Sequence, residues 1–251
     1  MSLAIIIITV LVVLAVIGQV YTRRVVQTDN LELSQGMVEA MLGVVGTLFS
    51  LLLGLLVANA IESYHEIKVQ VSEEANSLAN IYRLSEGLES VDRLKIRETC
   101  RVYNRKVITD EWPKMANMEM SQDCWDLYGK IWSDCVLLKP ETEQASNIQS
   151  SLLDSAKNLG ETRRARSITC KAKLSPILWA AIFFGSIITI VFTYFFTSKI
   201  GRLHTLLTVL IAISLGLNIW LLAAYSLPFS SELKIQPEIF EILEQQVFKT
   251  H

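Results

Sequence analysis

Four long apolar runs divide this chain, and each is long enough to cross a lipid bilayer. They cover residues 3–20, 36–60, 177–197 and 205–224. A helix of about 20 apolar residues spans the roughly 30 Å hydrocarbon core of a membrane. We therefore predict an all-α membrane protein with four transmembrane helices, the last two paired as a hairpin by a short connection.

The first run could instead be a signal peptide. No basic residue precedes it, however, and no small-x-small cleavage site follows it. We interpret residues 3–20 as a retained transmembrane helix. The polar segment after it is short, so we expect the first two helices to form an antiparallel pair.

The second run does not stop at the membrane boundary. From Gly36 to about Leu88 the sequence has no proline, and a helix of that length would be about 80 Å long, well beyond the bilayer core. We predict one helix that crosses the membrane over residues 36–60 and continues into a helical cytosolic domain, residues 61–174, inserted between the second and third spans.

Apolar residues in this middle segment recur every three or four positions, as on one face of a helix. Ser90 and Ser121 are predicted N-caps, and Pro113 is predicted to end the helix that starts near Ser90. With the extension of the second span, these helices predict a bundle of four. The predicted stripes are Ile96, Cys100, Tyr103 and Val107; Leu127, Ile131, Cys135 and Leu138; and Ala145, Ile148, Leu152, Ala156 and Leu159.

A cytosolic tail, residues 225–251, follows the fourth span. It contains a predicted short helix from Pro237, with Phe240, Leu243 and Val247 on one side.

Composition agrees with a chain in which apolar and charged segments are separated, because 51% of the residues are hydrophobic and 19% are charged. The middle segment has 17 Lys and Arg against 18 Asp and Glu, so it offers no basic surface for nucleic acid. The four cysteines lack the close spacing of a zinc site. We expect them to be buried thiols in a reduced compartment.

Basic residues favour one orientation. With both termini inside, seven basic residues flank the inner side and four lie in the outer loops, as the positive-inside rule prefers. The inner residues are Lys68, Arg163, Arg164, Arg166, Lys171, Lys173 and Lys234, and the outer ones are Arg23, Arg24, Lys199 and Arg202. A long soluble domain can cross the membrane regardless of its charge.

One face of the second span has small and polar side chains: Glu39, Gly43, Gly46, Thr47, Ser50, Gly54 and Ala58. The opposite arc is bulky, with Met41, Val45, Leu48, Phe49, Leu52 and Leu56. Small residues at this spacing let two helices pack closely. Alternatively, copies of the helix in a ring could line a pore with this face. A carboxylate inside a span favours the pore, because it needs water or a partner.

Other polar groups have two interpretations each. Glu62 and His65, with Lys68, extend the small face and would lie at a cytosolic mouth; their Glu-x-x-His spacing is also that of di-iron bundles, but no second such pair exists. Arg163, Arg164 and Arg166 could bind lipid phosphates or pair with acidic residues of neighbouring helices. Asn218 is expected to bond across to another helix. We find no catalytic residues, no metal site and no cofactor motif.

Several short segments, in this order, resemble the bacterial bestrophin-like domain proteins. The segments are GLLVANAIESYHE, EEANSLANIYRL, DEWPKM at Asp110–Met115, RRARS at Arg163–Ser167, SPILW at Ser175–Trp179, GRLH at Gly201–His204 and LPFSSE at Leu227–Glu232. The family tends to continue Pro-Phe-Ser with glycine, where this chain has Ser231.

The resemblance implies a multi-pass protein of the bacterial inner membrane, with both termini and the large domain cytoplasmic. By analogy with bestrophin channels, it implies a homo-oligomer, a pentamer, in which the second span lines a path for inorganic ions. Membrane lipid is the other expected partner, and nucleic acid is not expected. The rival class is a non-conducting scaffold or sensor whose helical domain binds a partner.

Overall fold

The computed structural model describes residues 2–25, 31–172, 174–195 and 201–248, and these contain helices and no strand. The helices are α1 (Ser2–Val25), α2 (Leu31–Leu84), α3 (Ser90–Lys106), α4 (Trp112–Met115), α5 (Gln122–Val136), α6 (Glu143–Lys171), α7 (Pro176–Tyr194), α8 (Gly201–Tyr225) and α9 (Glu238–Gln246). Lys173, Lys199 and the predicted end of the third span at 196–197 lie outside the described residues.

The chain forms two compact units. The first comprises Met1–Glu62 and Lys173–Ser226, and the second comprises Ser63–Ala172 and Leu227–His251. α2, which has 54 residues, contributes to both units. This confirms the prediction that the second apolar run continues as one uninterrupted helix, because nothing in residues 31–84 removes a backbone donor.

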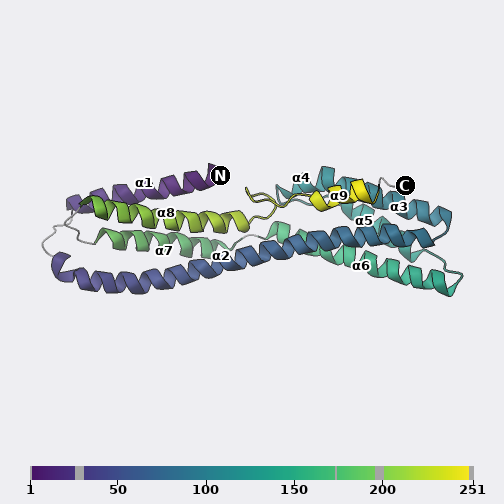
Figure 1. Cartoon of the computed structure of the whole chain (residues 1–251), viewed down its shortest axis with the longest axis horizontal. Coiled ribbons are helices and arrows are strands. Elements are labelled where there is room, and N and C mark those ends of the chain that lie inside the picture. Colours follow the sequence, from purple (N-terminus) through teal and green to yellow (C-terminus); the bar gives the residue numbers. More distant parts are fainter. Residues whose placement is uncertain (1, 26–30, 173, 196–200, 249–251) are drawn as a thin grey trace. The chain divides into compact units, whose positions relative to one another are not determined.

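Among its described residues, the first unit contains four helices that are long and apolar enough to cross a membrane: Leu3–Arg24, the N-terminal part of Gly36–Gly87, Pro176–Tyr194 and Arg202–Tyr225. α1 lies along α8, and α7 contacts both (Figure 1). A Cβ added at Gly216 of α8 would lie 3.2 Å from the Cα of Ile8. The close approach of α1 and α8 therefore depends on a glycine at that position.

The second unit packs the C-terminal part of α2 with α3, α5 and α6, as the sequence predicts. Ile96, Cys100, Tyr103 and Val107 of the first predicted stripe have at most 1% of their surface exposed. Leu152, Ala156 and Leu159 of α6 are also buried, while Ile148 is partly buried. The periodicity identified the buried faces because polar residues occupy the other positions of these helices.

Pro113 does not end a helix, contrary to the prediction. α3 is followed by a π-helical segment, Val107–Glu111, and then by α4, with Pro113 in the first turn of α4. Proline is tolerated in a first turn because its missing N–H is not needed there. The widened π turn places Glu111 in the interior of the unit.

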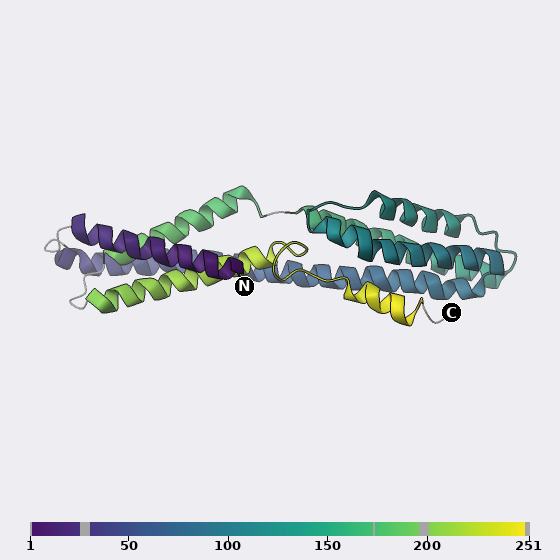
Figure 2. The ribbon, with the colours of Figure 1, turned by 90° about the horizontal axis from the view of Figure 1, so that it is seen from above.

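The tail adds the helix α9 to the second unit. α9 contacts α3 and the π-helical segment, and Figure 2 shows this tail helix in yellow, seen from above. Phe240 is fully buried, and its ring lies edge-on to Trp112 at 5.7 Å. The indole N–H of Trp112 donates to the carbonyl of Ile235, 3.0 Å away. Phe240 and Leu243 are buried and Val247 is partly buried, which confirms the predicted inward face of the tail helix.

Candidate functional sites on α2 and in the second unit

Within the first unit, α2 has three different faces. Phe49, Leu53 and Val57 are buried against the other helices of this unit. Val44, Leu48 and Leu55 form a bulky face that is at least 60% exposed. The bulky arc of the sequence prediction is therefore divided, because its Phe49 packs inside the first unit and its Leu48 faces outward.

The small-residue face of α2 is the third face. Glu39, Gly43, Thr47, Ser50, Gly54 and Ala58 are exposed, and Gly46 is partly buried. A Cβ added at Gly43 or Gly54 would meet no other atom within 4 Å. By contrast, a Cβ on Gly185 of α7 would meet the ring of Phe49. Gly185 thus serves helix packing within the chain, whereas the glycines on the small-residue face of α2 do not.

This face borders an open groove of about 610 Å³ in the first unit. Hydroxyl groups of Thr47, Ser50, Thr189 and Ser214 contribute to its lining, and the remaining walls are glycine or aliphatic. The hydroxyl of Thr47 donates to the carbonyl of Gly43 at 2.6 Å, so its oxygen remains an acceptor. The complete lining is Leu42, Gly43, Gly46, Thr47, Ser50, Leu51, Thr189, Ile211, Ser214 and Leu215.

Glu62 ends the first unit, and His65 and Lys68 lie in the second. All three side chains are exposed. The His65 ring lies edge-on to Tyr64 at 6.0 Å, and the Tyr64 hydroxyl donates to the carbonyl of Leu233 at 2.9 Å. Within the described ranges no group of three His, Cys, Asp or Glu side chains is arranged to hold a metal ion. A role for Glu62, His65 and Lys68 at a cytosolic mouth stays a prediction.

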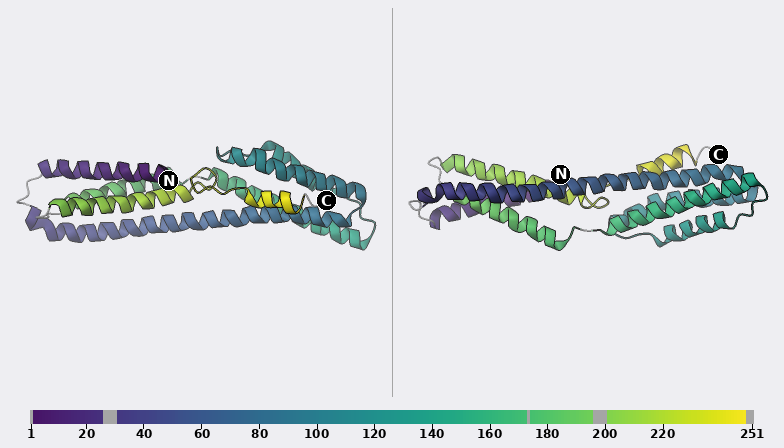
Figure 3. Two further views of the ribbon diagram at one scale, coloured as in Figure 1. Left: turned by 45° about the horizontal axis from the view of Figure 1, so that its top comes forward. Right: turned by 90° about the horizontal axis from the view of Figure 1, so that it is seen from below.

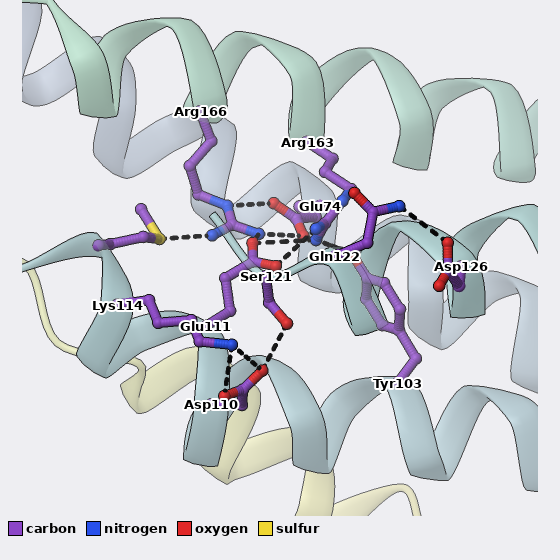
Figure 4. Close-up of polar contacts among 11 residues, drawn as sticks. Glu74, Tyr103, Asp110, Glu111, Lys114, Ser121, Gln122, Asp126, Arg163 and Arg166 are labelled. Carbon is purple, nitrogen blue, oxygen red and sulfur yellow. Dashed lines mark hydrogen bonds and ion pairs between the residues drawn. The ribbon is translucent and has the colours of Figure 1, made fainter. Parts of the chain in front are cut away.

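The second unit encloses an ionic cluster. The sequence analysis gave ion pairing as one of two interpretations of its arginines, but it did not identify Glu74 and Glu111 as their partners. Figure 4 shows Arg163 and Arg166 pointing from α6 toward Glu74 of α2 and Glu111 of the π-helical segment. Arg166 donates to both carboxylate oxygens of Glu74, from Nε at 2.6 Å and from Nη2 at 2.8 Å. Its Nη2 also lies 2.7 Å from Oε1 of Glu111. None of the four side chains has exposed surface.

Arg163 forms the second half of the cluster. Its Nη1 and Nη2 donate to the two carboxylate oxygens of Glu111 at 3.0 and 2.5 Å. Nη1 also donates to the hydroxyl of Tyr103, which in turn donates to Glu74 at 2.7 Å. Two arginines and two glutamates, whose formal charges cancel, therefore form one network across three segments of chain. Pairing of this kind is the condition under which buried charges are tolerated.

Aromatic side chains shield this network from water. The Arg163 guanidinium lies 4.6 Å from the ring centre of Trp125, and that of Arg166 lies 5.3 Å from the ring of Trp112. Burial disfavours the charged form of Arg166, but Glu74 and Glu111 outweigh this effect and raise its pKa. Burial and the Glu74 charge also raise the pKa of Tyr103. Arg166 consequently keeps its charge across the physiological pH range.

At the edge of the cluster, Asp110 links two segments (Figure 4). It accepts hydrogen bonds from Ser121 at 2.5 Å and from Lys114 at 2.9 Å. These bonds hold the pKa of Asp110 below its usual range. Ser121 occupies the predicted N-cap position of α5, but its hydroxyl is used for Asp110 and not for the helix terminus.

Two sequence interpretations need correction. Arg163 and Arg166 have no exposed surface to offer a lipid phosphate, so the ion-pairing alternative describes them. Arg164 is exposed, and its binding to lipid phosphates stays a prediction. Asn218 donates to the carbonyl of Ser214 in its own helix at 2.9 Å instead of bonding to another helix. This carbonyl is four residues earlier, within reach without any partner helix.

Three of the short segments quoted in the sequence analysis meet at the ionic cluster. Glu74 comes from EEANSLANIYRL, Glu111 and Trp112 from DEWPKM, and Arg163 and Arg166 from RRARS. A fourth segment, LPFSSE, supplies Phe229, whose ring lies edge-on to Trp112 at 5.8 Å. Residues far apart in sequence thus build one structural centre of the second unit.

The family model described as the bestrophin-like domain matches residues 9–240 of the chain. No curated protein and no solved structure matches it.

Proposed function

We propose that this chain, which belongs to the bestrophin-like family, is one subunit of an oligomeric ion channel of the bacterial inner membrane. In this proposal the small-residue face of α2 lines the path for inorganic ions, and the second unit and both termini are cytoplasmic. A pentamer is the assembly that the analogy with bestrophins suggests. The protein has four apolar helices that are long enough to cross a membrane. Besides the other subunits and inorganic ions, membrane lipid is therefore its partner.

The groove beside α2 is the observation that favours a path along this helix. Its four hydroxyl-bearing residues come from α2, α7 and α8, and hydroxyl oxygens can replace part of the hydration shell of an ion. The adjoining glycines have no side chain to project from α2, whereas a larger residue at these positions would narrow the groove. Because the chain itself does not fill this space, the space is open to ions or to a neighbouring subunit.

The bulky face of α2 supports an arrangement of several subunits. Val44, Leu48 and Leu55 are exposed on the side of the helix away from the buried Phe49. In a ring, such a face can pack against lipid or against the next subunit while the small-residue face turns to the axis. Glu39 would then lie near one mouth of the path, where water can solvate its carboxylate.

Flux measurements test this proposal. Purified protein in liposomes is expected to release a trapped ion. Gly54→Leu is expected to reduce the flux strongly by narrowing the path, and Glu39→Gln is expected to change the ion preference. Leu55→Ala, on the bulky face of the same helix, serves as the control and should keep the flux. The oligomer size of each variant is measured in detergent.

A monomeric wild-type protein would refute the proposal, as would an oligomer that shows no flux. If the flux of Gly54→Leu equals that of the wild type, the ions do not pass along α2. A protein that assembles but does not conduct would leave the scaffold or sensor as the better hypothesis. The exposed apolar residues Val91, Leu94 and Leu137 of the second unit would then be the first surface to test for a bound partner.

A further inference from the structure

Gln19 of α1 is buried with neither end of its amide satisfied. Only 1% of its surface is exposed, and neither Oε1 nor Nε2 has a hydrogen-bond partner. Two amide atoms without hydrogen bonds in an apolar helix interface cost folding free energy. They therefore point to a hydrogen-bonding partner that the protein chain itself does not supply.

The surroundings of Gln19 are polar and come from three helices. At one end of the first unit, Arg23 of α1 donates from Nη2 to Nδ1 of His204 on α8, 2.8 Å away. Nε2 of His204 lies 2.7 Å from the carbonyl oxygen of Thr193 on α7. Because arginine can only donate, Nδ1 of His204 is the acceptor and Nε2 carries the proton. This chain of bonds fixes the three helices to one another at this level.

Gln19 and Thr208 lie one turn further into the same interface. α1 and α8 run in opposite directions side by side (Figure 3). Gln19 is four residues before Arg23, and Thr208 is four residues after His204. Since Arg23 and His204 are bonded to each other, one turn of helix from each brings Gln19 and Thr208 to a common level. Both are 1% exposed.

Thr208, at the level of Gln19, and Thr193, next to His204, can only accept further hydrogen bonds. The hydroxyl of Thr208 donates to the carbonyl of His204 at 3.1 Å, and that of Thr193 donates to the carbonyl of Ile190 at 2.6 Å. Their protons are therefore committed to their own helices, while their oxygens keep acceptor capacity. The missing partner must donate to these oxygens and to Oε1 of Gln19, and must accept from Nε2 of Gln19.

We propose that the interface of α1, α7 and α8 holds buried water, bound by the amide of Gln19 and the hydroxyl oxygens of Thr193 and Thr208. Water both donates and accepts, and a buried molecule usually has about three polar partners. An anion would find too few donors. A cation would lie one turn from Arg23 with no acidic side chain among the described buried residues of the first unit to balance it.

The proposed site is separate from the small-residue face of α2 and does not depend on conduction. It would give the first unit a hydrated polar centre inside each subunit, next to the Arg23–His204 pair.

Solid-state NMR on the full chain in liposomes tests the site directly. With glutamine labelled by ¹⁵N, polarisation is transferred from water to nearby side-chain amides. We expect early transfer to the Gln19 side chain although it lies inside the helix group. The signal is assigned by its loss in Gln19→Met or, if that variant does not fold, in Gln19→Glu. Absence of transfer to Gln19 at long mixing times would overturn the proposal.

Thermal unfolding gives an independent readout. Gln19→Met keeps the size of the side chain but removes both hydrogen-bonding ends, so it should lower the unfolding midpoint if water is bound there. In a dry interface the same change removes an unsatisfied amide and should raise the midpoint, which would also overturn the proposal. Leu14→Met, at a position of α1 that is 60% exposed, is the control and should leave the midpoint unchanged.

Discussion

Arg166 and Glu74 form a two-pronged ion pair in the centre of the second unit, with N–O distances of 2.6 and 2.8 Å and no exposed surface on either side chain. Glu74→Gln would leave Arg166 charged, buried and paired only with Glu111. We expect this substitution to cost about 3–5 kcal/mol of stability, measured as a large fall in the thermal midpoint of the full chain.

Glu98→Gln is the control for this prediction. Glu98 pairs with Arg101 on the surface of α3 at 4.0 Å, and its side chain is 68% exposed. An exposed pair of this kind contributes about 0–1 kcal/mol. Equal effects of Glu74→Gln and Glu98→Gln would show that the buried pair is not important for stability.

The contact between Phe49 and Gly185 fixes α2 to the rest of the first unit. A Cβ at residue 185 would meet the Phe49 ring, so Gly185→Ala should destabilise the protein by about 1–3 kcal/mol. Adding Phe49→Leu should restore part of the loss, because the smaller side chain makes room. At Gly54 a Cβ would meet nothing within 4 Å. Gly54→Ala should therefore leave the stability of the protein unchanged or raise it slightly, because alanine has a higher helix propensity than glycine. A Gly185→Ala protein as stable as wild type would contradict this packing.

The tail helix α9 provides another matched pair. Phe240 is fully buried, whereas Ile242, two residues later, is 44% exposed. Phe240→Ala should cost about 3–5 kcal/mol and should make the tail a target for limited proteolysis. Ile242→Ala should change stability by about 0.5 kcal/mol or less. Similar proteolysis of both variants would mean that α9 does not belong to the folded second unit.

Buried thiols predict a loss of stability at alkaline pH. Burial, with Glu111 for Cys124 and Asp134 for Cys135, raises the pKa of each thiol from 9.0 to about 12. Unfolded thiols therefore ionise first, and stability should be fully present below pH 9.0 and should fall as pH rises toward about 12. Each thiol contributes a slope of at most about 1.4 kcal/mol per pH unit.

Cys135→Ala tests this linkage. The variant should unfold with a shallower dependence on pH, because one fewer proton is released. The measurement is the thermal midpoint between about pH 8 and pH 11. An unchanged slope would show that Cys135 does not ionise on unfolding in this range.

Much of the fold was predictable because apolar periodicity and run length determine which helices form and which faces are buried. The continuity of α2 and the buried positions Ile96, Cys100 and Leu159 follow from the sequence in this way. Pro113 was misjudged because proline is compatible with a first helical turn as well as with a helix end. The choice between them depends on the π-helical segment, which depends in turn on tertiary contacts.

The acidic partners of Arg163 and Arg166 were not identified from the sequence, although a signal was present. Arg163 lies four residues after Leu159, and Glu111 lies four residues after Val107, so each continues a predicted apolar stripe with a charge. Charged residues are almost never fully buried unless they are paired. Two opposite charges on the inner faces of neighbouring helices could therefore have been identified as partners. The pairing geometry itself required the structure.

The small-residue face of α2 was predictable as a pattern, but its role was not. Close packing and a pore both require small side chains. The structure narrows this question, since Gly43 and Gly54 are not packed against their own chain.

Cysteine accessibility in the proposed channel tests the ion path along α2 without intermediate steps. The native cysteines are buried, so cysteines introduced at Ser50 and, on the bulky face, at Leu55 can be compared. A charged, membrane-impermeant thiol reagent applied during current recording should block Ser50→Cys channels and leave Leu55→Cys channels unaffected. Block of Leu55→Cys alone, or currents unaffected in both variants, would contradict a path along the small-residue face of α2.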